Sequence, residues 1–186
     1  MKNKKIIPIL LITMIIIGLV VYNKQNTQAG IMYGDKNAPI EVVNYTSFGC
    51  GGCAIFHDEL HETIKRYIDE GEIKFIEKPL DVKRFEFDEV VYKQMNEKQR
   101  TDFEELSKIY KTQDEWMAME SKEEVIEFLN LDKEENKKHI KDLKKITKEK
   151  EKLGLKEVPS VYINGEKISS DISVEEFEEK IDSLID

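Results

Sequence analysis

The only two cysteines of the 186-residue chain stand three positions apart, in the stretch SFGCGGC. If a helix begins at this stretch, Cys50 and Cys53 lie in its first turn about 5–6 Å apart, within the ~4.4–6.8 Å between Cα atoms that a disulfide allows. Unpaired N–H groups and the helix dipole favour an anion at a helix start. The spacing therefore predicts a redox pair. Cys50, with a lowered pKa, attacks, and the more buried Cys53 resolves the mixed disulfide.

Two glycines separate the cysteines. Gly51 and Gly52 each cost about 1 kcal/mol in helix propensity, and without side chains they let a partner chain approach the sulfurs closely. Substrate binding is the functional interpretation of the pair, and a chance flexible stretch is the alternative.

Two other uses of the cysteines stay open at this point. A structural disulfide between them closes almost no loop and therefore stabilises the fold little. A metal site would use Cys50, Cys53 and His57, whereas His61 would stand ~12 Å from Cys53 along a helix, too far for the same tetrahedral ion. Otherwise the pattern predicts surface or groove positions for His57 and His61, and a solvent-exposed position for His139.

The first residues predict an exported protein. Three lysines precede an uncharged run of 17 residues from Ile6 to Tyr22, which as a helix spans ~25 Å, just under a bilayer core. Residues 1–29 are therefore a signal peptide, cleaved after Ala29, or a retained membrane anchor, and both remain open. The lysines place the N-terminus in the cytoplasm and the remainder outside it, where disulfides persist.

The exported part, residues 30–186, is acidic. It carries 25 basic and 38 acidic residues, a net charge of −13. This balance argues against nucleic acid and an anionic membrane face as partners. The simplest interpretation of the charge is a well-solvated surface.

Hydrophobic periodicity predicts an α/β domain. A buried strand at about 40–45 leads into the cysteines, an amphipathic helix follows to Gly71, and a second strand ends before Pro79. This order is a βαβ unit with the cysteines at the strand-to-helix junction. At the other end of the chain, Asn164-Gly165 predicts a hairpin turn, and a helix follows at about 174–184.

The middle of the chain is predicted to be helical. Residues 84–153 contain no glycine or proline and suggest three or four helices. A capping box begins one helix at Ser121, and another begins at Leu131 and ends at Gly154. Trp116, the only tryptophan, is predicted to anchor helix packing.

Four stretches together resemble the DsbA-like branch of the thioredoxin superfamily: GDKNAPIEVVNY, SFGCGGC, the helical block, and EVPSVYING. The resemblance runs over about 34–186. It implies a thioredoxin fold (βαβ … ββα) over 30–186, with an inserted all-helical domain at about 84–153.

The resemblance also assigns site residues. It implies that Pro159 is cis and faces the redox pair of Cys50 and Cys53. It further implies that the backbone of Val158 pairs with an extended substrate chain.

Two departures from the family pattern bear on the chemistry. The dipeptide between the cysteines is Gly-Gly, where strong oxidases of the family carry Pro-His, so we expect a less acidic Cys50 and a less oxidising pair. Asn44 stands six residues before Cys50, where the superfamily often has a buried acid that accepts a proton. We therefore expect slower or water-assisted deprotonation of Cys53.

These observations predict an extracytoplasmic thiol–disulfide oxidoreductase, membrane-anchored or secreted, that forms disulfides in exported proteins. It would act on protein or peptide thiols, need no cofactor beyond its cysteines, and by resemblance be re-oxidised by a quinone-linked membrane partner. The compartment and the valine before Pro159 favour an oxidase, and the Gly-Gly dipeptide weakens that preference. A reductase or isomerase of the same fold, and a non-enzymatic metal-handling binder, stay open.

Overall fold

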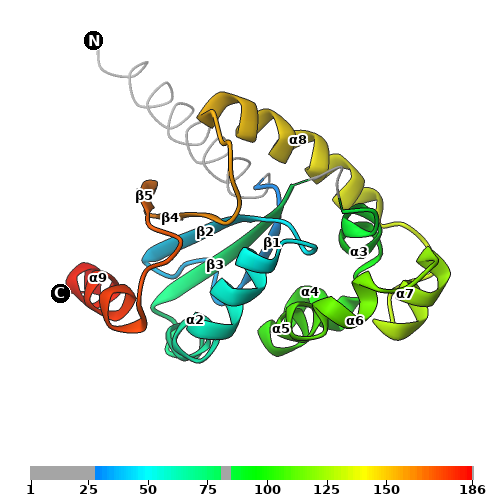
Figure 1. Ribbon diagram of the computed structural model, residues 1–186. Coiled ribbons are helices and arrows are strands. Elements are labelled where there is room, and N and C mark those ends of the chain that lie inside the picture. The colour runs from blue at the N-terminus through cyan, green and yellow to red at the C-terminus, as the bar shows by residue number, and fades with distance from the viewer. Residues whose placement is uncertain (1–27, 81–84, 186) are drawn as a thin grey trace, which may run out of the picture.

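A five-stranded sheet forms the centre of the computed structural model, which describes residues 28–80 and 85–185 (Figure 1). The strand order is β1-β3-β2-β4-β5. The strands are β1 (Ile31–Tyr33), β2 (Ile40–Thr46), β3 (Ile73–Pro79), β4 (Ser160–Ile163) and β5 (Glu166–Ile168). Strands β2 and β3 are parallel, and the other neighbouring pairs are antiparallel.

The predicted βαβ unit is present. Helix α2 (Gly51–Asp69) begins directly after β2 and ends before Gly71, whose φ of +76° suits a glycine. At the other end of the chain β4, β5 and α9 (Val174–Ile185) form the predicted ββα unit. The turn residues Asn164 and Gly165 both have positive φ, which a tight hairpin of this type requires. Strand β1 has only three residues and was not predicted.

Helices cover both faces of the sheet (Figure 1). Helices α2 and α9 pack on one face, where apolar residues of β2 and β3 form the larger core with Phe177 and Ile181 of α9. Helix α8 (Lys137–Leu153) lies on the opposite face, where Ile146 packs against Val43 and Ile76. Because side chains alternate along a strand, consecutive residues of β2 and β3 face different helices.

The segment between β3 and β4 is helical, as predicted, but its described part holds six helices instead of three or four. They are α3 (Asp88–Gln94), α4 (Glu97–Thr101), α5 (Phe103–Lys111), α6 (Gln113–Met117), α7 (Lys122–Phe128) and α8. Side-chain caps divide the helical run where no glycine or proline does so: Asn96, Asp102, Ser121 and Asn136 each accept a hydrogen bond from the backbone of the helix that follows. The prediction that a helix begins at Leu131 was therefore wrong, because Asn136 caps α8. Its predicted end at Gly154 is confirmed.

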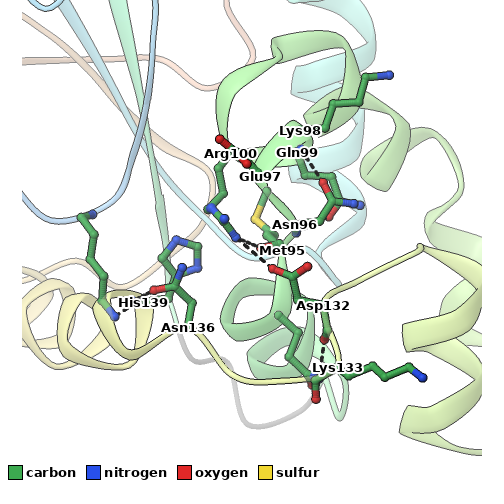
Figure 2. A network of polar contacts seen from close by, with 12 residues as sticks. Met95, Asn96, Glu97, Lys98, Gln99, Arg100, Asp132, Lys133, Asn136 and His139 are labelled. Carbon is green, nitrogen blue, oxygen red and sulfur yellow. Dashed lines mark hydrogen bonds and ion pairs between the residues drawn. The ribbon is translucent and has the colours of Figure 1, made fainter.

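A polar network joins α3, α4 and α8 (Figure 2). The Arg100 guanidinium donates to the Met95 carbonyl and lies 3.4 Å from a carboxylate oxygen of Asp132. In the same region His139 is buried, with its Nδ1 2.6 Å from the Tyr92 carbonyl oxygen and its ring stacked on that of Tyr92. The prediction that His139 is solvent-exposed was wrong, since it stands on the inner face of an otherwise lysine-rich helix. Its burial lowers its pKa.

The predicted N-terminal signal or anchor lies almost wholly outside the described residues. Among the helices of the described part, none is long and apolar enough to cross a membrane.

Trp116 is fully buried, and its indole N–H donates to the Ile109 carbonyl at 2.8 Å. We expect Trp116→Ala to lower the free energy of unfolding by about 3–5 kcal/mol, because it leaves a large cavity and removes that donor. Urea unfolding followed by circular dichroism measures the loss. Glu115→Ala, at an exposed position in the same helix, should change stability by about 0.5 kcal/mol or less. Equal effects from the two variants would contradict the anchor role of Trp116.

Candidate active site

The two cysteines stand at the N-terminus of α2. Cys50 is the N-cap residue, with extended backbone (φ −92°, ψ 117°), and the Cys53 amide donates to the Cys50 carbonyl at 2.9 Å. Cys50 is 7% exposed and Cys53 is 0% exposed. The predicted difference in burial is confirmed, since Cys50 is the more exposed of the two cysteines.

The Val158–Pro159 bond is cis and lies against the cysteines. The Cys50 Sγ donates to the Val158 carbonyl oxygen at 3.6 Å. A Cβ added to Gly52 would stand 3.6 Å from Cδ of Pro159, whereas one added to Gly51 would meet nothing within 4 Å. The structure thus brings together five of the predicted site residues and leaves the Gly51 side of the turn open. The five are Cys50, Gly52, Cys53, Val158 and Pro159.

Helices of the segment between β3 and β4 hold the turn that precedes Cys50. The Gly49 amide donates to Asp88 Oδ1 of α3 at 2.6 Å, and Gln113 of α6 donates to the Phe48 carbonyl at 2.5 Å. A Cβ on Gly49 would lie only 2.7 Å from the side chain of Phe85. This turn is therefore fixed by hydrogen bonds and close packing from a distant part of the sequence.

The surroundings of Cys53 raise the pKa of its thiol well above the usual range. The largest cause is a hydrogen bond with Cys50, followed by burial, while hydrogen bonds from the Thr46 hydroxyl and the Ser47 backbone act in the opposite direction. Cys53 therefore stays protonated until a group accepts its proton.

A buried polar cluster lies behind Cys53, on the α2 face of the sheet. Its centre is the fully buried carboxylate of Glu77 in β3. Asn44 Nδ2 donates to one carboxylate oxygen at 3.1 Å, and His57 Nε2 lies 3.0 Å from the other, which also accepts from the Tyr110 hydroxyl. That hydroxyl lies 2.8 Å from Thr46 Oγ1. Thr46 is in turn a side-chain partner of Cys53. Burial, and next the charge of Glu77, raise the pKa of Tyr110 well above its usual value.

Glu77 and Tyr110 were missed by the sequence analysis. Side chains alternate between the two faces of a strand, so Glu77 lies on the same face of β3 as Ile73 and Phe75 and its side chain points into the core. The sequence signal that could have identified Glu77 was an acidic residue on the apolar face of a buried strand. Tyr110 comes from the helical segment, and nothing in its local sequence connects it with the cysteines.

A family model described as thioredoxin matches residues 26–183. The chain belongs to the thioredoxin family. Membership supports thiol–disulfide oxidoreductase activity in general. No curated protein matches the sequence.

Solved structures share the thioredoxin fold. A conserved protein of unknown function from Enterococcus faecalis has a TM-score of 0.70 at 20% identity, over 84% of this chain and 91% of that chain. Alpha-DsbA1 from Wolbachia pipientis has a TM-score of 0.64 at 22% identity, over 83% and 90%. BdbD from Bacillus subtilis has a TM-score of 0.61 at 17% identity, over 84% and 92%. At these identities the likeness shows the fold, and together with the family match it confirms the predicted membership of the thioredoxin superfamily.

His57 and His61 were predicted at the surface or in a groove, and both are buried. His61 contacts Ser107 through Nδ1 and stacks on Phe103, and His57 contacts Glu77. His57 does line a cleft of about 500 Å³ between α2 and α5. Within residues 28–80 and 85–185, no three His, Cys, Asp or Glu side chains are grouped to hold a metal ion.

We expect Asn44→Asp to be destabilising at neutral pH by about 1–3 kcal/mol, because it replaces a donor to Glu77 with a second buried carboxyl. The like charge raises the pKa of the introduced carboxyl in the folded state. The folded protein then binds more protons than the unfolded chain above about pH 4, so the loss of stability grows as pH rises.

Denaturant unfolding of this variant between acidic and neutral pH measures the effect. Asn44→Ala is the matched control, since it removes the same donor without adding a charge. A loss in Asn44→Asp that follows the pH dependence of Asn44→Ala would contradict the prediction.

Proposed function

We propose that the protein is an extracytoplasmic thiol–disulfide oxidoreductase that forms disulfides in exported proteins. The observation that carries the proposal is the arrangement of the two sulfurs. Cys50 stands at the rim beside the cis-proline loop and the open side of Gly51, and Cys53 is fully buried behind it. This arrangement suits one sulfur that meets substrates and one that completes the exchange.

In the oxidising direction a substrate thiolate attacks the Cys50 sulfur of the Cys50–Cys53 disulfide. A bond forms between the substrate sulfur and Cys50, and Cys53 leaves with the electron pair and takes up a proton. A second substrate thiolate then attacks the first substrate sulfur and releases Cys50 as a thiolate. The substrate is oxidised by two electrons, the protein is reduced by two, and no cofactor beyond the cysteines takes part.

The substrate chain would lie along the loop of Val158 and Pro159. Val158 is half-buried, and its carbonyl oxygen points to the Cys50 sulfur. Gly51 and Gly52 present no side chain to an approaching peptide. The N-terminal lysines and apolar run support export, with the membrane contacted through that segment if it is uncleaved. A quinone-linked membrane partner would re-oxidise the pair, and reduction or isomerisation by the same residues is the alternative direction.

A redox titration in glutathione buffers should give the Cys50–Cys53 couple a potential above about −180 mV. Disulfide donors of this fold lie near −120 mV, and thioredoxin lies near −270 mV. A potential below about −230 mV would contradict the oxidase direction and favour a reductase, while leaving thiol–disulfide exchange itself intact.

Catalysed refolding of a reduced, disulfide-dependent protein tests the activity directly. We expect multiple turnovers with an oxidant present, complete loss in Cys50→Ser, and accumulation of mixed disulfides with substrate in Cys53→Ser. Copper or zinc retained in stoichiometric amount by the purified protein, and lost in Cys50→Ser, would instead support the metal-handling binder.

A further inference from the structure

We propose that Thr46, Tyr110 and Glu77 form a proton relay that takes the thiol proton of Cys53 and returns it. The inference rests on the proposed thiol–disulfide exchange and deepens it. It assigns the proton acceptor for the resolving cysteine to a residue of β3, reached through two hydroxyl groups.

The contacts form an unbroken chain. The Thr46 hydroxyl is the side-chain partner whose hydrogen bonding lowers the pKa of the Cys53 thiol, against the larger raising effects of Cys50 and burial. Thr46 Oγ1 lies 2.8 Å from the Tyr110 hydroxyl, and either oxygen can be the donor. The Tyr110 hydroxyl donates to Glu77 Oε1. Because each hydroxyl both donates and accepts, a proton can move along the chain by exchange at each oxygen.

Burial makes a protein route necessary. The side chains of Cys53, Thr46 and Glu77 are each 0% exposed. Solvent therefore does not touch the thiol that must lose its proton. The cleft between α2 and α5 reaches Tyr110, but it does not reach Cys53.

Side chains from several elements surround the Glu77 carboxylate. Asn44 of β2 and His57 of α2 contact its oxygens, and Tyr33 of β1 is a further titratable group close to it. Burial and then the charge of Glu77 raise the pKa of Tyr33, so that hydroxyl stays neutral. The neighbouring Lys78 pairs with Glu149 of α8, on the opposite face of the sheet.

The proton of Cys53 is accounted for both when the Cys50–Cys53 disulfide forms and when it opens. When Cys53 attacks the Cys50 sulfur of a mixed disulfide, its proton passes to Thr46, the Thr46 proton passes to Tyr110, and the Tyr110 proton passes to the Glu77 carboxylate. The S–S bond between Cys50 and Cys53 forms, and the substrate leaves as a thiolate. When a substrate opens that disulfide, the departing Cys53 thiolate recovers the proton by the reverse path. Thr46 touches the reacting sulfur and is catalytic, while Glu77 and Tyr110 act through it as positioning residues.

The test follows the reaction of the reduced protein with a chromogenic aromatic disulfide by stopped flow. The first aromatic thiolate is released when Cys50 attacks, at a rate that depends on reagent concentration. The second aromatic thiolate is released when Cys53 resolves the mixed disulfide, at a rate that does not depend on reagent concentration. We expect Glu77→Gln and Tyr110→Phe to slow only the second phase near neutral pH, by about 100-fold, the lower end of what a positioned general base contributes. In these variants the second phase should then rise with pH, because hydroxide that reaches Cys53 when the site opens transiently takes the proton in place of the relay.

Matched variants separate the relay from structural damage. Thr46→Val removes the hydroxyl at nearly constant shape and should slow the second phase as Tyr110→Phe does, whereas Thr46→Ser should restore it. Combining Thr46→Val with Tyr110→Phe should slow the second phase little further, because both variants break the same chain of hydrogen bonds.

Tyr92→Phe is the control, since the Tyr92 hydroxyl is buried without a hydrogen-bond partner in the described part of the chain. It should leave both phases unchanged. The hydroxyl variants keep the Glu77 carboxylate, so the test does not depend on whether Glu77→Gln folds.

The outcomes distinguish the two proposals. A wild-type second phase and pH profile in Tyr110→Phe and Thr46→Val would overturn the relay and leave the oxidoreductase standing. Equal slowing of both phases would also overturn it, because a structural defect then explains the result. A wild-type protein that releases only the first aromatic thiolate would overturn thiol–disulfide exchange by the pair, and the relay with it.

Discussion

The buried carboxylate of Glu77 constrains the packing of the whole redox side of the molecule. A carboxylate without water must be satisfied by donors from the protein, or its burial costs several kcal/mol. Here the donors come from three elements: Asn44 in β2, His57 in α2 and Tyr110 in α5. The rings of His57 and Tyr110 stack 4.0 Å apart, so the same contacts that satisfy the charge also bring α5 against α2. A polar requirement at one strand position thus fixes how two helices meet the sheet.

The helical segment between β3 and β4 consequently does more than cover the sheet. Asp88 of α3 and Gln113 of α6 hydrogen-bond the turn that leads into Cys50, and Tyr110 of α5 contacts Thr46 at the end of β2. The last residue of β2 and the turn that follows it are therefore both held by this segment. Fixing a reacting group through packed neighbours of this kind is what keeps its geometry within the narrow limits that exchange chemistry requires.

The sequence predicts the features whose signals are local. The cysteine pair, the Asn164-Gly165 hairpin and the strand and helix periods follow from short-range rules, and the cis Pro159 follows from resemblance. The helix boundaries inside 84–153 were less accessible, because single capping residues such as Asn136 begin new helices within a run that the hydrophobic period alone would treat as continuous. His57 and His61 were placed at the surface or in a groove, because a polar residue on a helix is usually exposed. Their burial depends on partners, Glu77 and Ser107, that only the tertiary structure brings to them.

The position of the acid connects fold and chemistry. Asn44 occupies the place where the superfamily often carries a buried acid, and Glu77 is its direct partner in the parallel register of β2 and β3. Neighbouring strands are about 4.8 Å apart, so Glu77 places a carboxylate one strand away from that position and on the same face of the sheet. From β3, Glu77 is connected to Cys53 only through two intermediate side chains. These are Tyr110 of α5 and Thr46 of β2. With the acid on β3, the proposed relay includes Tyr110 of α5, so the chemistry of a local cysteine pair depends on a helix from a distant part of the chain.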